Sequence, residues 1–99
     1  MAAVQLALND QKKGSFYLEE GGERLGEMVV GISGNNLTAY HTEVAPKAEG
    51  KGYAKELLNA MVDYARKNHL HVIPLCPFVH AQFKRHPEDY ADLWKATQP

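Results

Sequence analysis

The chain has 99 residues, enough for one domain but not for two with cores of ordinary size, and we expect residues 1–99 to form a single domain. Hydrophobic residues make up 44% and charged residues 23%, a balance typical of a globular domain that excludes a disordered or low-complexity chain. The formal net charge of −1 excludes a global basic field, so we expect no nucleic-acid partner.

The cysteine and histidine residues indicate the cellular compartment and whether a metal site is expected. Cys76 is the single cysteine, which rules out an intrachain disulfide and suits a reducing compartment. The five histidines are not spaced with paired thiolates, so we expect no metal site. Residues 1–9 have no basic segment and only a short, interrupted apolar run, unlike a signal peptide or a membrane span. We therefore expect a cytoplasmic protein without a membrane partner.

The first half of the chain predicts three strands. Aromatic, aliphatic and β-branched residues gather over Ser15–Glu19, Arg24–Ile32 and Leu37–Val44, the residue types that strands favour. Turns rich in glycine, asparagine and glutamate separate these stretches, over residues 20–23 and 34–36. Short polar turns join antiparallel neighbours, so the three strands are expected to form a meander.

The strongest periodic signal follows these strands. Apolar residues recur at helical spacing on one face of a stretch from about Lys51 to Asn68: Ala54, Leu57, Leu58, Met61, Val62 and Ala65. A short buried strand is expected next, over Leu70–Leu75. A strand, a helix and a second strand make a βαβ unit, in which Leu37–Val44 and Leu70–Leu75 run parallel with a right-handed crossover. The fold class is therefore α/β (α+β), with a mixed sheet.

Beyond this unit, the sequence predicts a short helix over Phe78–Arg85. Pro87 then opens a final turn that continues through Trp94. The residues after Trp94 are expected to fray.

A glycine-containing loop lies between the third strand and the long helix. Gly50 and Gly52 flank Lys51 at the helix start, where the first backbone amides have no internal partners and the helix dipole is positive. A phosphate or pyrophosphate is the natural ligand of such a turn. The spacing fits neither a Walker A loop nor a dinucleotide-binding fingerprint. A strand–helix turn that binds no ligand is the alternative.

The loop resembles the acetyl-coenzyme A loop of the GNAT superfamily of N-acetyltransferases, whose pattern is Gln/Arg-x-x-Gly-x-Gly/Ala. The corresponding residues are Glu49-Gly50-Lys51-Gly52-Tyr53-Ala54. Three further segments, in the same order, resemble a small stand-alone GNAT-like branch: His41-Thr42-Glu43-Val44, Pro74-Leu75-Cys76-Pro77-Phe78-Val79 and Arg85-His86-Pro87-Glu88. The resemblance covers roughly residues 15–94 and implies a minimal GNAT-like fold.

The resemblance also implies a cofactor and the residues that bind it. Acetyl-coenzyme A is the expected cofactor, bound at Val44, Glu49, Gly50, Lys51, Gly52, Tyr53, Ala54 and Lys55. The family pattern has Gln or Arg where this chain has Glu49, and a carboxylate repels a pyrophosphate. Weaker binding is expected, with Lys51 and Lys55 offsetting part of the repulsion.

Three residues compete for the catalytic role. In GNAT folds the thioester lies between the strands on either side of the helix, which here implies a position near His41, Glu43 and Cys76. Cys76, with His80 four residues later, is a candidate for accepting the acetyl group, and the alternative is an inert buried thiol. His41 and Glu43 share one face of a strand and are candidates for the general base, and the alternative is a solvated face.

The acceptor is left open by the sequence. The resemblance implies transfer of acetyl to an amine, either a small molecule or an exposed lysine. A non-catalytic module that binds or senses acyl-coenzyme A is the alternative, because few residues are left over to shape an amine pocket.

Overall fold

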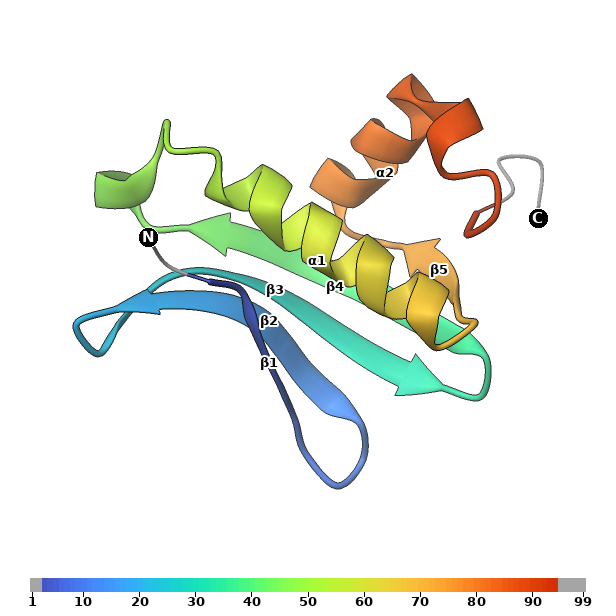
Figure 1. Ribbon diagram of the computed structural model, residues 1–99, viewed down its shortest axis with the longest axis horizontal. Helices are drawn as coiled ribbons and strands as arrows, with labels where there is room; N and C mark the ends of the chain where they lie inside the picture. Colours follow the sequence, from blue (N-terminus) through green and yellow to red (C-terminus); the bar gives the residue numbers. More distant parts are fainter. Residues whose placement is uncertain (1–2, 95–99) are drawn as a thin grey trace.

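The computed structural model describes residues 3–94, so the expectation for the residues after Trp94 lies outside the described residues. Residues 3–94 form five strands, two α-helices and two 3-10 turns, arranged as Figure 1 shows. In chain order these are β1 (Gln5–Leu8), β2 (Lys13–Glu20), β3 (Glu23–Ser33), β4 (Asn36–Val44), η1 (Pro46–Ala48), α1 (Tyr53–Lys67), β5 (His71–Pro74), α2 (Pro77–Arg85) and η2 (Pro87–Asp89).

The sheet is mixed, as predicted. Its strand order is β1-β2-β3-β4-β5, in which the first four strands are antiparallel neighbours and β4 pairs with β5 in parallel. The parallel ladder runs from Asn36↔His71 to Ala39↔Pro74. Gly34, with a φ of 59°, takes the left-handed conformation that the tight β3–β4 turn requires. The meander and the βαβ unit are thus confirmed.

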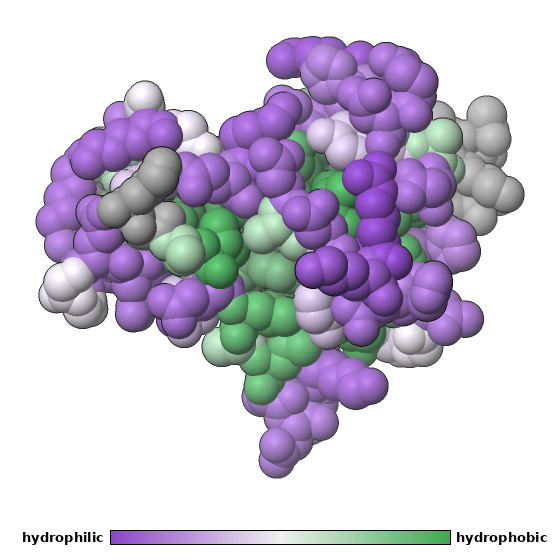
Figure 2. Space-filling view, in the orientation of Figure 1, coloured by the Kyte–Doolittle hydropathy of each residue, from purple (hydrophilic) through white to green (hydrophobic). Residues whose placement is uncertain are grey.

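Strand β1 was not predicted. It has only four residues, and half-buried side chains alternate with exposed ones along it. The pairing with β2 runs from Gln5↔Tyr17 to Leu8↔Gly14. Three partly buried apolar residues of this segment pack against the core: Val4, Leu6 and Leu8. Figure 2 shows apolar surface over this edge of the sheet, surrounded by polar side chains.

Helix α1 lies across one face of the sheet (Figure 1). The helix packs on β2, β3 and β4, and its buried residues are Tyr53, Leu57, Leu58, Met61, Val62 and Ala65. It begins two residues later than predicted, because Gly52 at its N-cap has a φ of 80° and is not helical. Neither α1 nor α2 is long and apolar enough to cross a membrane, and the same holds for every helix in residues 3–94.

Helix α2 packs against the β4–β5 end of the sheet. Helix α2 contacts β4 and β5, and its Phe83 ring stacks on Tyr90 with 4.6 Å between ring centroids. The Val72 amide donates a hydrogen bond to the Leu93 carbonyl, which ties the end of the described chain to β5. These contacts fix β5 and the start of α2 next to β4, where the candidate site lies.

Candidate active site

The loop between η1 and α1 exposes a set of backbone amides. Gly50 and Gly52 have φ values of 84° and 80°, and a Cβ at either position would meet open space. The first α1 backbone hydrogen bond is donated by Glu56 to the Gly52 carbonyl at 3.1 Å, and Gly52 has no side chain to cap the helix. The amides of residues 53–55 therefore have no intrahelical acceptor and point toward the loop, which is suited to a phosphate.

A cavity of about 310 Å³ opens at this loop. Six of the eight residues predicted to bind acetyl-coenzyme A are among its lining residues, which are Val44, Ala48, Glu49, Gly50, Gly52, Tyr53 and Ala54. The other two are exposed: Lys51 directly precedes Gly52, and Lys55 lies in the first turn of α1. The concave glycine loop and its amides fit a pyrophosphate. Lys51 lines a separate cavity, together with Glu20, Glu23 and Lys47.

Strands β4 and β5 separate at the middle of β4. Their ladder ends at Ala39↔Pro74, and the Cys76 amide donates a further backbone hydrogen bond to the Ala39 carbonyl at 2.8 Å. Strand β4 continues from Ala39 to Val44. Over this second half it pairs only with β3 among the strands of residues 3–94. Among residues 3–94, no strand pairs with the β5-facing backbone edge of this half of β4.

A β-bulge at Tyr40 decides which β4 side chains face the core. Val30 pairs with Ala39 and Val29 with His41, so Tyr40 is the extra residue. Before the bulge Leu37 and Ala39 are buried, and after it the half-buried positions are Thr42 and Val44. His41 and Glu43 are consequently exposed on the opposite face of the strand.

Cys76 is buried on the core side of the sheet. Its exposed fraction is 1%, and its Sγ lies 3.2 Å from Thr42 Oγ1, at hydrogen-bonding distance. His80 donates its backbone amide to the Cys76 carbonyl, while its ring packs edge-on against Trp94 with a centroid distance of 5.5 Å. Sequence reasoning missed Thr42, whose position two residues before Val44 places it on the core face.

His41 and Glu43 form a second pair on the open face. His41 Nε2 lies 3.3 Å from Glu43 Oε1, and the side chains are 56% and 68% exposed. Because Cys76 is in contact with Thr42 on the core face, the three predicted catalytic residues do not converge. The structure brings together His41 with Glu43, and Cys76 with Thr42, on opposite faces of β4.

A larger cavity, of about 530 Å³, lies beside Glu43 at the end of β4. Its lining residues are Arg24, Leu25, Gly26, Glu27, Glu43, Val44, Ala45 and Pro46. Val44 is the one residue that lines both this cavity and the loop cavity. The sequence analysis did not identify Arg24 or Glu27, because their place beside Glu43 depends on the pairing register of β3 and β4.

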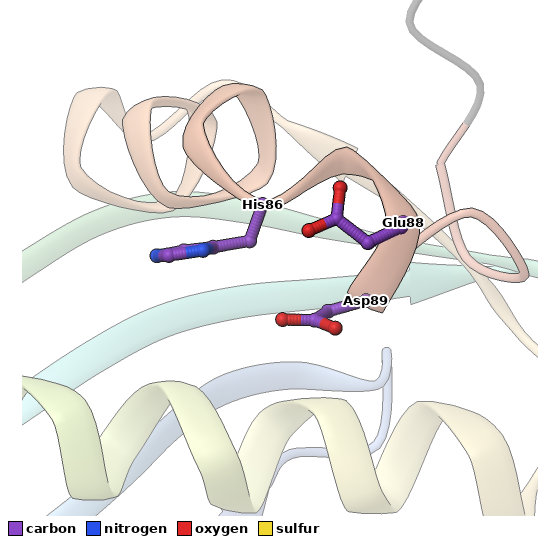
Figure 3. Close-up of side chains that lie close together, drawn as sticks. All are labelled: His86, Glu88 and Asp89. Carbon is purple, nitrogen blue, oxygen red and sulfur yellow. The ribbon is translucent and has the colours of Figure 1, made fainter.

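Three possible metal ligands gather away from these cavities. His86, Glu88 and Asp89 each present one ligand atom within 4.8 Å of the others at the η2 turn (Figure 3). Glu88 and Asp89 are exposed to water. The sequence analysis did not single out these three residues, which lie together at the N-cap of η2 and within η2.

The comparison with family models identifies the protein class. Residues 15–93 match the family of GCN5-related N-acetyl-transferases, and the chain belongs to this family. A comparison with curated protein sequences gives no match.

Solved structures share the fold. A GCN5-like protein from Staphylococcus aureus is 26% identical, with a TM-score of 0.72, over 96% of this chain and 89% of that one. A ribosomal-protein-alanine N-acetyltransferase from Brucella melitensis biovar Abortus 2308 is 18% identical, with a TM-score of 0.64, over 91% of this chain and 67% of that one. The ribosomal-protein-S18-alanine N-acetyltransferase of Escherichia coli is 16% identical, with a TM-score of 0.60 over 67% of this chain, which spans only 43% of that enzyme. The GNAT-like fold predicted from the loop and strand motifs is therefore confirmed.

Proposed function

We propose that the protein is an N-acetyltransferase that takes an acetyl group from acetyl-coenzyme A and transfers it to an amine. The observation that carries this proposal is the loop at the start of α1, where two left-handed glycines open a cavity onto unpaired helix amides. Family membership supports the same donor. When bound, acetyl-coenzyme A supplies the acetyl group as a thioester.

In this proposal the loop binds the pyrophosphate of the cofactor and β4 binds its pantetheine arm. The amides of residues 53–55 would hold the pyrophosphate, with Lys51 and Lys55 adding positive charge from either side. The unpaired backbone of β4 after Tyr40 would hydrogen-bond the amide groups of the pantetheine arm. Both contacts use backbone atoms, so they tolerate changes in most side chains but not at Gly52.

The exposed pair on β4 favours direct transfer. An amine is protonated near neutral pH and must lose a proton before its nitrogen attacks a carbonyl carbon. Glu43 and His41 are open to water and to an approaching amine, and their 3.3 Å contact lets a proton pass from one to the other. Glu43, which also lines the larger cavity, is the residue we assign as the base, with His41 as its partner.

A route through Cys76 is the second candidate. There the Cys76 sulfur would attack the thioester carbonyl, the coenzyme A sulfur would leave and take up the thiol proton, and the amine would then displace Cys76. The position of Cys76 where β4 and β5 separate, with Thr42 at 3.2 Å, favours this route. Its burial opposes the route, because a nucleophile needs a path to the reacting carbon and a thiolate needs stabilisation.

The donor site is tested with a substitution at Gly52. We expect Gly52→Trp to abolish coenzyme A binding measured by calorimetry, because the indole would occupy the space in front of the helix amides. Gly34→Trp is the matched control: Gly34 also has a positive φ and open space around its Cβ, but it lies in the β3–β4 turn. Undiminished binding to folded Gly52→Trp would refute the assigned loop.

A further inference from the structure

We infer that two copies of this chain associate by pairing their β1 strands edge to edge, so that one continuous sheet runs through both copies. This association is independent of the acetyltransferase function proposed above. The free backbone of β1, the apolar groove beside it and the charges at the rim of that groove support it.

The outer edge of β1 presents free backbone groups. Among residues 3–94, β1 pairs with β2 alone. The Asn9 amide donates a hydrogen bond to the Lys13 carbonyl of β2 at 2.9 Å. Because inward-facing and outward-facing residues alternate along an antiparallel ladder, Leu6 and Leu8 direct their backbone amides and carbonyls away from β2. Another strand can pair with these groups.

The β1 edge lacks the features that protect edge strands in natural sheets, which are charged side chains, proline, a bulge or a covering segment. Strand β1 (Gln5–Leu8) contains no charged residue and no proline, and its register with β2 is continuous. The opposite edge of the sheet is protected. There the Val72 amide of β5 donates a hydrogen bond to the Leu93 carbonyl, and Pro74 has no amide hydrogen to donate.

An apolar groove of about 300 Å³ lies beside this edge, between β1 and α1. Val4 and Leu6 line the β1 side of the groove, and Ala60 and Tyr64 line the α1 side. All four side chains are half-buried. Figure 2 shows the apolar surface over this edge. A second copy seated here would remove part of that surface from water, which favours association.

The charges at the rim of the groove make a second copy the occupant that fits. Asp63 and Lys67 line the α1 side and are exposed, and neither forms an ion pair with another residue of the described part of the chain. A two-fold axis at the β1 edge sets the two α1 helices in opposite directions. The carboxylate on one rim then comes opposite the ammonium group on the other, and the same two residues provide both contacts.

The outward-facing residues also define the register of the pair. With the two-fold axis at Leu6, Val4 of one copy lies opposite Leu8 of the other, and the two Leu6 residues exchange backbone hydrogen bonds. The half-buried side chains of both β1 segments then lie on the face that α1 covers in each copy. Strands β2 and β3 separate β1 from β4, so the candidate active site of each copy stays open.

Sedimentation velocity over a concentration series tests the association. We expect the average mass of the wild-type protein to rise from that of one chain toward that of two between about 1 and 100 µM. The mass of a single chain throughout this range would overturn the inference and leave a strand of a different protein as the occupant of the edge. Growth beyond two chains would also overturn it, because a two-fold contact closes on itself.

A lysine on β1 tests whether this edge forms the contact. Ala7 is exposed, so Ala7→Lys leaves the single copy folded, but in the pair it places two lysines diagonally across the axis. We expect at least about fivefold weaker association. Ala81→Lys is the matched control, because Ala81 is exposed on α2, which contacts β4 and β5. Association that Ala7→Lys weakens no more than Ala81→Lys does would contradict the assignment to β1.

Charge reversal on α1 tests whether the partner is a second copy. Asp63→Lys places like charges on both rims, and we expect about threefold weaker association at low salt. Adding Lys67→Asp to the same chain restores opposite charges across the axis and should recover the wild-type affinity. Equal association of the single variant, the double variant and the wild type would refute the two-fold arrangement, as would a double variant no better than the single one.

Discussion

Glu49 lies, with its side chain exposed, in the loop proposed to bind the pyrophosphate (residues 49–54, called the phosphate loop below), where the GNAT pattern has Gln or Arg. In the proposed site its carboxylate would oppose a pyrophosphate held at the neighbouring amides, while Lys51 and Lys55 would favour one. The proposed site would therefore depend more on backbone amides than a loop with a cationic first residue. This balance makes the charge at position 49 a direct probe of where the phosphates lie.

We predict that Glu49→Arg tightens coenzyme A binding, lowering Kd about three- to tenfold at low salt, because a repulsion is replaced by an attraction at an exposed site. Calorimetry at low and high salt measures the effect, which shrinks as screening increases. Glu88→Arg makes the same charge change in η2 and should leave Kd unaltered. A gain of equal size in both variants would mean that Glu49 does not face the phosphates.

Cys76 decides between the two routes of transfer. We predict that Cys76→Ser retains turnover within about threefold, because a buried sulfur bonded to Thr42 is positioned for packing, and serine keeps a hydroxyl in the same place. Coenzyme A binding should be unchanged. An acetyl adduct on the wild-type protein that hydroxylamine removes and that Cys76→Ser lacks, together with lost turnover, would instead establish the acetyl-cysteine route.

At the scale of elements, the bulge in β4 explains why the fold was predictable and the site only partly so. The two-residue turn at Gly34-Asn35 sets the β3–β4 pairing, and alternation from Leu37 and Ala39 would place His41 on the core face. The extra residue, Tyr40, shifts the later register by one position. His41 and Glu43 thereby face outward, and Glu43 comes opposite Glu27.

The helix and the glycine loop could be predicted from periodicity and motif, whereas the pairing register of β4 could not. The stripe of α1 gave the helix, because its spacing reports burial directly, and the glycines at 50 and 52 gave the loop, because their left-handed φ values require glycine. No comparable pattern marks a bulge, and Cys76 was grouped with His41 and Glu43 only because the family resemblance implies a thioester near all three. Strand β1 was not predicted because it has only four residues, alternately exposed and half-buried, and so short a stretch shows too little periodicity.

Gly14 is the residue on which the β1–β2 pairing depends. A Cβ at Gly14 would lie 1.9 Å from the Ala7 carbonyl oxygen, so β1 must move away. We predict that Gly14→Ala lowers the free energy of unfolding by about 1–3 kcal/mol, measured by urea denaturation. Gly26→Ala is the control: it is also in a paired strand, but its Cβ would meet neighbours only at 3.4 Å and beyond. Equal losses in the two variants would contradict this account of β1.

At the scale of the whole molecule, one ion pair joins the C-terminal end of α1 to the segment after η2. Arg66 Nε lies 2.9 Å from Asp92 Oδ2, and Arg66 Nη2 donates a hydrogen bond to the Asp89 carbonyl at 2.7 Å. Together with the Val72–Leu93 hydrogen bond, these contacts hold the last described residues against α1 and β5. They indirectly support the position of α2 and of Cys76 at its N-cap.

The same pair gives the stability of the protein a defined dependence on pH. The hydrogen bond from Arg66 lowers the pKa of Asp92 below its usual value of 3.8. An aspartate with a lowered pKa in the folded state stabilises that state above its unfolded-state pKa, and the contribution is lost as the pH falls through the folded-state pKa. The side chains are 44% and 55% exposed, so the contribution is within about 1 kcal/mol.

We therefore predict that Asp92→Asn lowers the free energy of unfolding by up to about 1 kcal/mol at pH 7, and that the difference from wild type shrinks as the pH falls below 3.8. Urea denaturation at a series of pH values measures it. Glu88→Gln removes a carboxylate from the neighbouring turn that has no such arginine contact, and serves as the control. Coenzyme A binding should be unaffected at pH 7, because the pair lies at the opposite end of α1 from the phosphate loop. A difference between Asp92→Asn and wild type that stays constant from pH 7 to pH 3 would show that Asp92 acts through packing rather than through its charge.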